Sequence, residues 1–418
     1  MRNIYLSIII LLVSVACFAQ WTQVNSGINN LATGARLLGA TNTDLFAVSI
    51  ASGVFKTNDN GNNWTQVTTP VGFTSPPKCG YYFTGKFFVG LDNSTNCISY
   101  TSDNGVNWIS GSGSPASTVV RGFISLSSDL FAFTSTKGVF KSSDGGVTWN
   151  TANTGLTNLK IASITTINNK IVLATEGAGV FISSDNGSNW VANNNGIIGS
   201  KNGTFVWTMG TNLYFYTMTG NQYYSSNNQG ANWTTAIRPA FLQSSIIGQT
   251  KSIKEIYRNG NNLYMMSKTQ YGISITDSVF ITTNEGANWT NITENLPNDV
   301  LGGGLTEFGG NIFIAYGSSN LGIYRKGNTV GIKENYLANL ISIHPNPFND
   351  KILLSNSSNK KIKEISIYDN LGKLILSETV NTEHINSPQL SNGLYVIKIL
   401  FSDNSIAQKK LIKESINR

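Results

Sequence analysis

The side chains that most often catalyse reactions or bind metals are scarce in this sequence. Of 418 residues only two are histidines, His344 and His384, and both lie in the last fifth of the chain. A His-based catalytic triad or a histidine metal site is therefore excluded from the preceding residues. The three cysteines show no zinc-binding spacing. We expect no metal and no cofactor, so any chemistry must come from carboxylates, cations and aromatic side chains.

Paired carboxylates are the remaining route to catalysis, because glycoside hydrolysis needs two of them facing one cleft. Half of the acidic residues of the first 330 fall in repeated turns, but Asp92, Glu176 and Asp277 fall in loops between predicted strands. These three are the candidate catalytic residues if the protein is a glycosidase. The alternative is that no carboxylate pair forms and the protein only binds its ligand.

Four cations occupy equivalent positions. Each lies nine residues before an apolar run that reads as a strand, and the four are Arg36, Lys78, Arg121 and Lys254. Such a set is predicted to stand at one end of neighbouring strands, where it would form part of a collar that attracts an anionic ligand such as an acidic glycan. The competing interpretation is that these are solvated loop cations whose alignment is coincidental.

One repeat unit is enlarged. The interval from Trp233 to Leu263 is 30 positions where the other units take 22 to 24, and Leu263 to Trp289 takes 26 where the others take 19 to 21. Both insertions are expected on the same side as the four cations. Because such loops often carry recognition, Arg238, Tyr271 and Asp277 are binding candidates, against the alternative of neutral loop growth.

The elements that position these residues follow from an eight-residue phrase that occurs six times. Each copy reads like TSDNGVNW: Ser or Thr comes first, Gly fifth and Trp last. The third residues are Asp59, Asp103, Asp144, Asp185, Asn228 and Asn284, and the tryptophans are Trp64, Trp108, Trp149, Trp190, Trp233 and Trp289. Asp or Asn can accept backbone hydrogen bonds within a tight turn, and Trp buries a large apolar face. Because Asn replaces Asp in two copies, we interpret the phrase as structural.

Each phrase belongs to a unit of four short strands that alternate apolar and polar residues. WTQV at Trp21 has no phrase before it, and LGIYRK (321–326) has no tryptophan strand after it. Together these orphan strands complete one unit if the array is circular. The sequence therefore predicts an all-β, seven-bladed β-propeller over residues 20–330, closed by its N-terminal strand.

The phrase resembles the Asp-box, or BNR repeat (S-x-D-x-G-x-x-W), of sialidases, xyloglucanases and sortilin-like receptors. Four copies match fully, and the copies at Asn228 and Asn284 depart at the acid. The resemblance implies that the box lies away from the ligand face, and it fixes no activity because the superfamily holds both catalysts and receptors. The arginine-containing F-R-I-P-like segment of sialidases is missing, since the nearest string is Ile237-Arg238-Pro239 late in the chain.

After residue 330 the pattern changes to a linker (331–340) and then to strands separated by Pro-Asn-Pro, Asp-Asn and Asn-Gly turns, which predict a small Ig-like β-sandwich over 341–418. The segments HPNPFNDKILL, ISIYDNLGKLIL, LSNGLYVIKIL and QKKLIK resemble the type A C-terminal sorting domain of the Bacteroidetes type IX secretion system. The resemblance implies that this machinery is a partner and that the protein is released or held at the cell surface. His344 and His384 are then turn or surface residues.

The N-terminal 19 residues read as a signal peptide, with Arg2, an apolar core and a small-residue cleavage site; a lipid anchor at Cys17 is the weaker alternative. In an exported protein Cys79 and Cys97 could form a disulfide, or remain two buried thiols. The net charge of +7 is spread along the chain and predicts no nucleic-acid partner.

Taken together, these patterns favour a secreted or surface-displayed, monomeric, non-catalytic binding module for a glycan or a surface protein. The alternative is a polysaccharide-degrading glycoside hydrolase with a carboxylate pair on the side away from the boxes.

Overall fold

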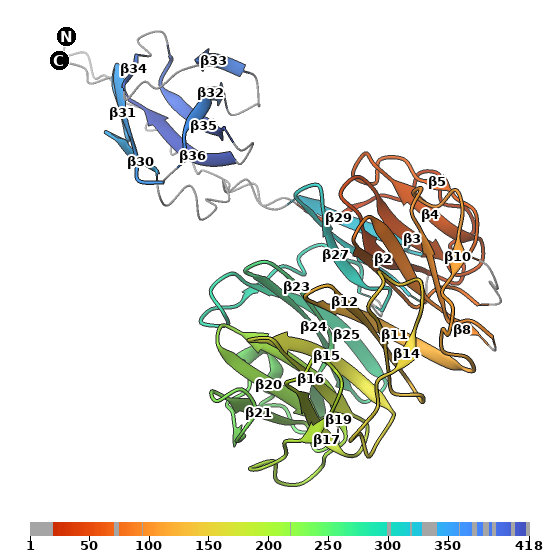
Figure 1. Cartoon of the computed structure of the whole chain (residues 1–418). Coiled ribbons are helices and arrows are strands. Elements are labelled where there is room, and N and C mark those ends of the chain that lie inside the picture. Colours follow the sequence, from red (N-terminus) through yellow and green to blue (C-terminus); the bar gives the residue numbers. More distant parts are fainter. Residues whose placement is uncertain are drawn as a thin grey trace, which may run out of the picture. The chain divides into compact units, whose positions relative to one another are not determined.

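The computed structural model describes residues 20–70, 75–93, 95–217, 219–298, 302–317, 320–327, 341–358, 360–369, 374–378, 384–386, 390–402 and 406–414. The expected signal peptide (1–19) and linker (331–340) lie outside these residues. The chain divides into two compact units between residues 328 and 329. Both units are built from strands (Figure 1). In the described part of the chain, no helix has the length and apolar character needed to span a membrane.

The described part of the first unit contains seven antiparallel sheets, numbered here in chain order. Sheet 1 holds β2 (Ala35–Ala40), β3 (Leu45–Ser49), β4 (Gly53–Thr57) and β5 (Thr65–Gln66). Sheet 2 holds β6 (Cys79–Phe83), β7 (Lys86–Gly90), β9 (Ile98–Thr101) and β10 (Ile109–Ser110). Sheet 3 holds β11 (Thr118–Leu126) as its first strand, then β12 (Asp129–Thr134), β13 (Val139–Ser142) and β14 (Asn150–Thr151), and the short β8 (Asp92–Asn93) is an extra edge strand beside β11. Sheet 4 holds β15 (Ile161–Ile167), β16 (Lys170–Thr175), β17 (Gly179–Ser183) and β18 (Val191–Ala192).

The remaining sheets differ in strand length and in how they are completed. Sheet 5 holds β19 (Gly203–Met209), β20 (Asn212–Thr217), β21 (Gln222–Ser226) and β22 (Thr234–Thr235). Sheet 6 follows a short 3-10 helix, η1 (Ala240–Leu242), and holds β23 (Gln249–Asn259), β24 (Asn262–Tyr271), β25 (Ser274–Thr282) and β26 (Thr290–Asn291). Sheet 7 holds β27 (Leu305–Phe308), β28 (Asn311–Ala315), β29 (Ile323–Gly327) and β1 (Thr22–Gln23).

The N-terminal strand completes the last sheet, as predicted from the orphan WTQV segment. Thr22 pairs with Arg325 and Gln23 with Tyr324, in antiparallel register. Beside them the buried Trp21 indole donates a hydrogen bond of 2.6 Å to the backbone oxygen of Ile292. The two ends of this unit are therefore joined by both backbone pairing and side-chain packing.

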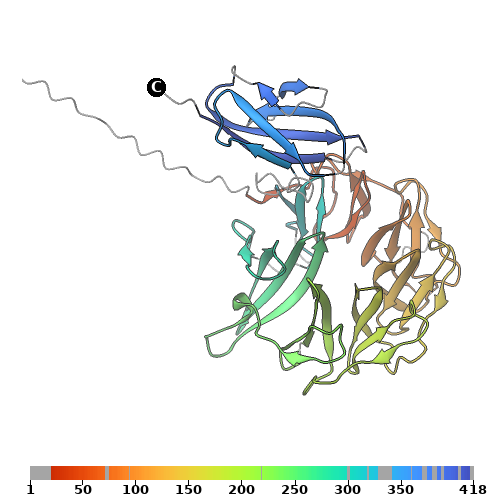
Figure 2. The same ribbon diagram turned by 60° about the vertical axis from the view of Figure 1, so that its left-hand side comes forward.

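Hydrophobic packing between the sheets is circular. Seven clusters of buried side chains occur in the described part of the unit, and each joins one sheet to the next. For example, Phe46 of sheet 1 stacks on Phe87 of sheet 2 with 4.4 Å between ring centroids. The series returns to its start where Phe313 of sheet 7 packs with Leu37 and Trp64 of sheet 1. Figure 2 lets the reader follow the sheets around this ring in colour order.

The repeated phrase forms the turn between the third and fourth strands of its sheet. In the first copy, Thr57 Oγ1 donates to Asp59 Oδ1 (2.7 Å), and the Asn63 N–H donates to the same oxygen (3.0 Å). Gly61 has a φ of 82°, which a side chain tolerates poorly. In the fifth copy the Asn228 side-chain oxygen accepts the equivalent bonds from Ser226 Oγ and the Asn232 N–H, both at 2.9 Å. An amide oxygen therefore accepts these two hydrogen bonds as a carboxylate oxygen does.

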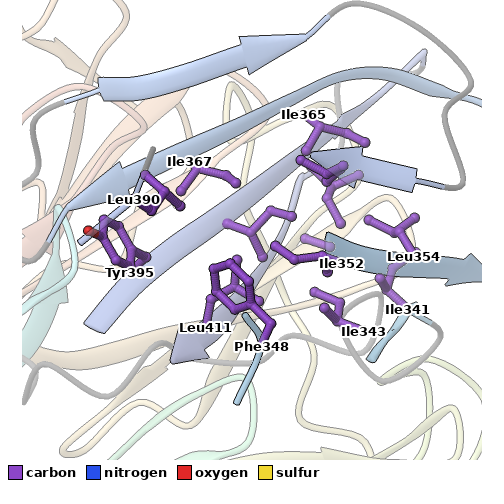
Figure 3. Close-up of a cluster of buried hydrophobic side chains, with 14 of the residues drawn as sticks. Ile341, Ile343, Phe348, Ile352, Leu354, Ile365, Ile367, Leu390, Tyr395 and Leu411 are labelled. Atoms are coloured by element: carbon purple, nitrogen blue, oxygen red, sulfur yellow. The ribbon is translucent and has the colours of Figure 1, made fainter. Parts of the chain in front are cut away.

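The second unit is a sandwich of two antiparallel sheets. One holds β30 (Ile341–His344), β31 (Lys351–Asn356) and β34 (His384–Asn386); the other holds β32 (Ile362–Asp369), β33 (Leu374–Glu378), β35 (Gly393–Phe401) and β36 (Ile406–Lys413). Ile352, Ile367, Ile397 and Phe401 lie in one buried cluster between them (Figure 3). His344 is exposed at the end of β30.

Candidate functional site

All four cations aligned in the sequence line one pocket in the first unit. This pocket, called the central pocket below, has a volume of about 400 Å³. Its walls come from the first strands of sheets 1, 2, 3, 6 and 7 and from the residues just before them. The lining side chains that carry charge are Arg36, Lys78, Arg121, Lys254 and Glu255. Residues more than 200 positions apart in the chain thus converge on one cavity.

Irregular strand pairing explains how two of these side chains reach the pocket. In β11 the pairing with β12 skips from Val120 to Gly122, which leaves Arg121 as the extra residue. In β23 the pairing skips from Ile253 to Glu255, which leaves Lys254. A bulge of this kind removes a residue from the ladder and redirects its side chain.

Sheets 4 and 5 carry the same irregularity, with small uncharged residues at the bulge. There the skipped residues are Ala162 and Thr204. The bulge is therefore a repeated feature of the first strand, and a cation occupies it in only part of the ring. The aligned positions in the sequence correspond to a real structural position in these four sheets.

The four cations differ in their partners. Arg121 Nη1 lies 2.6 Å from Glu176 Oε1 and also donates to the backbone oxygen of Ile161 (2.9 Å). Lys254 Nζ lies 2.7 Å from Oδ2 of Asp277, whose side chain is fully buried. These two cations are neutralised by carboxylates within the ring.

Arg36 and Lys78 leave the pocket positively charged. Arg36 Nη1 donates to the backbone oxygen of Pro77 (3.0 Å), and burial lowers the pKa of the guanidinium from its usual value. The Lys78 ammonium has no hydrogen-bond or ion-pair partner among the residues that the structure describes. Together they provide positive charge that carboxylates in the ring do not fully compensate.

Glu255 is the site residue that sequence reasoning passed over. Its carboxylate accepts a hydrogen bond from the Leu305 N–H (3.0 Å) and lines the central pocket. Burial raises its pKa to about 7, and the Leu305 hydrogen bond and the nearby Lys254 and Arg36 only partly offset that rise. The sequence signal available was its place directly after the aligned Lys254, but nothing local distinguished it from a solvated glutamate.

The three candidate catalytic carboxylates do not line this pocket. Glu176 and Asp277 are held in the ion pairs with Arg121 and Lys254. Asp92 lies exposed on β8, where its backbone pairs with Val119 of β11. Two of the three candidate carboxylates are thus engaged by cations of the ring.

The two candidates from the enlarged unit lie elsewhere. Arg238 lines a separate pocket of about 490 Å³, together with Gln222, Gln243 and other residues around β21 and η1. Tyr271 ends β24 and is exposed. Neither side chain contributes to the lining of the central pocket.

Of the two alternatives for Cys79 and Cys97, a disulfide or two thiols, the structure has two free thiols. The Cys97 thiol donates to the backbone oxygens of Asn93 (3.2 Å) and Thr118 (3.1 Å), and the Cys79 thiol donates to that of Val120 (3.5 Å). Burial raises the pKa of the Cys79 thiol to about 12, so it is protonated at neutral pH. Each thiol thus donates a hydrogen bond to a backbone carbonyl of β11. The part of the chain that the structure describes contains no group of three or more His, Cys, Asp or Glu side chains arranged to hold a metal ion.

Each of the two units matches a protein-family model. Residues 80–330 match the model of the DUF6242 beta propeller domain, which covers more than half of the chain. The chain belongs to the DUF6242 β-propeller family. Residues 342–414 match the secretion system C-terminal sorting domain, which confirms the type IX sorting module expected from the sequence and indicates a secreted or cell-surface protein.

Solved structures support the fold of this DUF6242 protein. Ycf48 with a bound D1 peptide is 14% identical, with a TM-score of 0.53, over 74% of this chain and 96% of that one. The extracellular domain of a hybrid two-component system from B. thetaiotaomicron is 11% identical (TM-score 0.53), over 96% of this chain and 59% of that one. The GH74 xyloglucanase from Xanthomonas campestris is 12% identical (TM-score 0.51), over 91% of this chain and 59% of that one. At these identities the likeness concerns the fold alone. A search of curated protein sequences gives no match.

Proposed function

We propose that this protein is an exported, non-catalytic binding module whose central pocket holds an anionic ligand, with an acidic glycan as the ligand class. The observation that carries the proposal is the convergence of Arg36, Lys78, Arg121 and Lys254 on one cavity. A concave site lined by one sign of charge concentrates the electrostatic field and draws in ligands of the opposite charge.

The ion pairs of the four pocket cations support binding rather than hydrolysis. Arg36 and Lys78 can be neutralised by a ligand carboxylate, since the carboxylates Glu176 and Asp277 are already paired with the other two cations. An arginine guanidinium matches a carboxylate with two parallel hydrogen bonds, which gives the uronic acids of acidic polysaccharides a specific partner.

The rest of the chain is interpreted in the same framework. The seven sheets are proposed as the seven blades of a propeller over residues 20–330, with Asp-box turns between the third and fourth strands. The N-terminal 19 residues are proposed as a signal peptide that leads to the periplasm, and residues 341–418 as the module that type IX export recognises. The protein is proposed to act as a monomer, without cofactor or metal.

The test is a binding array of acidic and neutral polysaccharides with the purified protein. Lys78→Glu and Arg36→Glu should each abolish binding to uronic-acid polymers. The matched control is Lys137→Glu, an exposed cation in the loop between β12 and β13 that lies outside the central pocket. Circular dichroism and thermal melts confirm that each variant folds.

Three outcomes would refute the proposal. Undiminished binding by both pocket variants would exclude the central pocket as the site. Release of reducing ends from any bound polymer would show catalysis and favour the glycosidase alternative. Binding only to acidic peptides, included on the array beside the polysaccharides, would favour a surface protein as the ligand; Ycf48, which shares this fold, is seen with a bound D1 peptide.

A further inference from the structure

The tip of sheet 6 exposes an unusual group of large apolar side chains. The exposed fractions are 54% for Ile246, 95% for Ile247, 56% for Tyr271 and 103% for Ile273. These four residues are called the apolar tip below. They are neighbours because Gln249 pairs with Tyr271, the Gln249 N–H donates to the Ile246 oxygen (3.2 Å), and Gly248 lies against the Tyr271 ring.

The apolar tip projects beyond the central pocket. The β23–β24 ladder continues from Ile253 to Gln249, five residues past the bulge at Lys254. At about 3.4 Å per residue this adds roughly 17 Å of paired strand. The second strands of the other sheets have five or six residues in the described chain, whereas β24 has 10. The long strands of sheet 6 can be followed in blue-green in Figure 2.

The surroundings of the apolar tip are basic. Lys251 pairs with Thr269, two residues before Tyr271, so its side chain lies on the same face of the sheet as that of Tyr271. On β24, Lys268 is the cation nearest to Tyr271 in the sequence. The sequence contains no Asp or Glu from 232 to 254 or from 259 to 276. The carboxylate opposite Lys268, that of Asp277, is buried against Lys254.

A convex tip with this composition matches a lipid surface better than a protein partner. Four side chains on a projecting hairpin offer at most several hundred Å² of contact, below the roughly 1,000 Å² of a stable protein interface. A lipid interface accepts a narrow projection, because apolar side chains can enter between headgroups while neighbouring lysines stay among the anionic groups.

We propose that the apolar tip inserts into the interface of an anionic lipid surface, with Lys251 and Lys268 binding its headgroups. A secreted or surface-exposed protein meets such a surface at the cell envelope. The proposal is independent of the ligand in the central pocket, because none of the tip residues lines that pocket.

The experiment is co-sedimentation of the purified protein with vesicles of phosphatidylcholine alone, or of phosphatidylcholine mixed with phosphatidylglycerol. The wild-type protein should sediment with the mixed vesicles, and less so as salt is raised. Ile247→Ser with Ile273→Ser should lower the affinity by about tenfold or more per isoleucine removed. Lys251→Gln with Lys268→Gln should lower it about fivefold per lysine at low salt.

The matched control is Val191→Ser with Ile198→Ser, which removes two apolar side chains that are 63% and 75% exposed on another part of the ring. This variant should bind the mixed vesicles like the wild type. The proposal is overturned if the wild type does not sediment with mixed vesicles, or if the tip and control variants bind equally. It is also overturned if the tip substitutions instead abolish a concentration-dependent self-association, which would assign the tip to a second copy of the chain.

Discussion

Replacing Glu255 with Gln tests whether its carboxylate controls the charge of the central pocket. Folding raises the pKa of this group from 4.5 to about 7, chiefly by burial. Because the folded-state pKa is the higher one, its stabilising contribution is fully present below about pH 4.5 and is lost as the pH rises through about 7.

The size of the effect follows from that difference. A shift of this size corresponds to at most about 3 kcal/mol, at about 1.4 kcal/mol per pKa unit. The side chain faces a water-accessible pocket, which screens its charge, so we expect a loss of about 1–2 kcal/mol in the free energy of unfolding between pH 5 and pH 8. Glu255→Gln keeps an oxygen that accepts the Leu305 N–H and should remove most of this loss.

Ligand affinity should follow the same titration. Above pH 7 the ionised carboxylate opposes an anion beside Arg36, so a bound anion would raise its pKa further. Each additional pKa unit by which the anion raises the pKa of Glu255 corresponds to a tenfold fall in the affinity for that anion as the pH rises through the titration. Binding of an acidic polysaccharide should therefore weaken from pH 5 to pH 8 in the wild type and stay nearly level in Glu255→Gln.

The assay is urea unfolding and polysaccharide binding, both measured at intervals from pH 5 to pH 8. The informative quantity is the difference between wild type and variant at each pH, because it cancels the titration of every other group. A difference that is constant across this range would refute the raised pKa. A wild-type affinity that increases with pH would refute the placement of Glu255 beside the bound anion.

Three further predictions concern the ring itself. The pKa of Asp185 is lowered to about 2, chiefly by its hydrogen bond with the Asn189 side chain, so its stabilising effect is present above pH 4 and is lost as the pH falls through 2. Asp185→Asn should thus lower the melting temperature at pH 7 but not near pH 2. Asn228→Asp should raise the melting temperature at pH 7 but not near pH 2. Trp21→Ala should cost about 3–5 kcal/mol in urea unfolding, since it removes a buried indole where the ring closes. In the protein without residues 1–19, and so without Cys17, a thiol reagent should find two reactive groups, Cys79 and Cys97, after denaturation without reductant; finding none would indicate a disulfide.

The ion pairs show why a set of aligned cations was not enough to define the site. Four positive residues could be placed at one end of the strands from spacing alone, because a repeat converts sequence position into position around a ring. Their partners could not be placed. Glu176 lies 55 residues after Arg121, and Asp277 lies 23 residues after Lys254, and only strand pairing and bulge geometry bring each pair within 3 Å.

The sequence left the state of the two cysteines open for a related reason. Cys79 and Cys97 belong to one repeat, and an exported protein favours oxidised cysteines, but covalent bonding depends on the direction of each side chain. Here each thiol donates to a carbonyl of the neighbouring strand instead. Spacing along the chain contains no information about that direction.

The sequence by itself determined the architecture of this protein. The repeated phrase, its drift from Asp to Asn, the orphan strand at Trp21 and the turn-rich C-terminal segments each reflect short-range chemistry, in which turns and alternating strands are set by neighbouring residues. Tertiary structure alone decided which charged side chains remain free to bind a ligand and which are paired or buried. It neutralised Arg121 and Lys254, buried Glu255 and exposed Ile247 and Ile273, because burial and electrostatic pairing depend on residues distant in the chain.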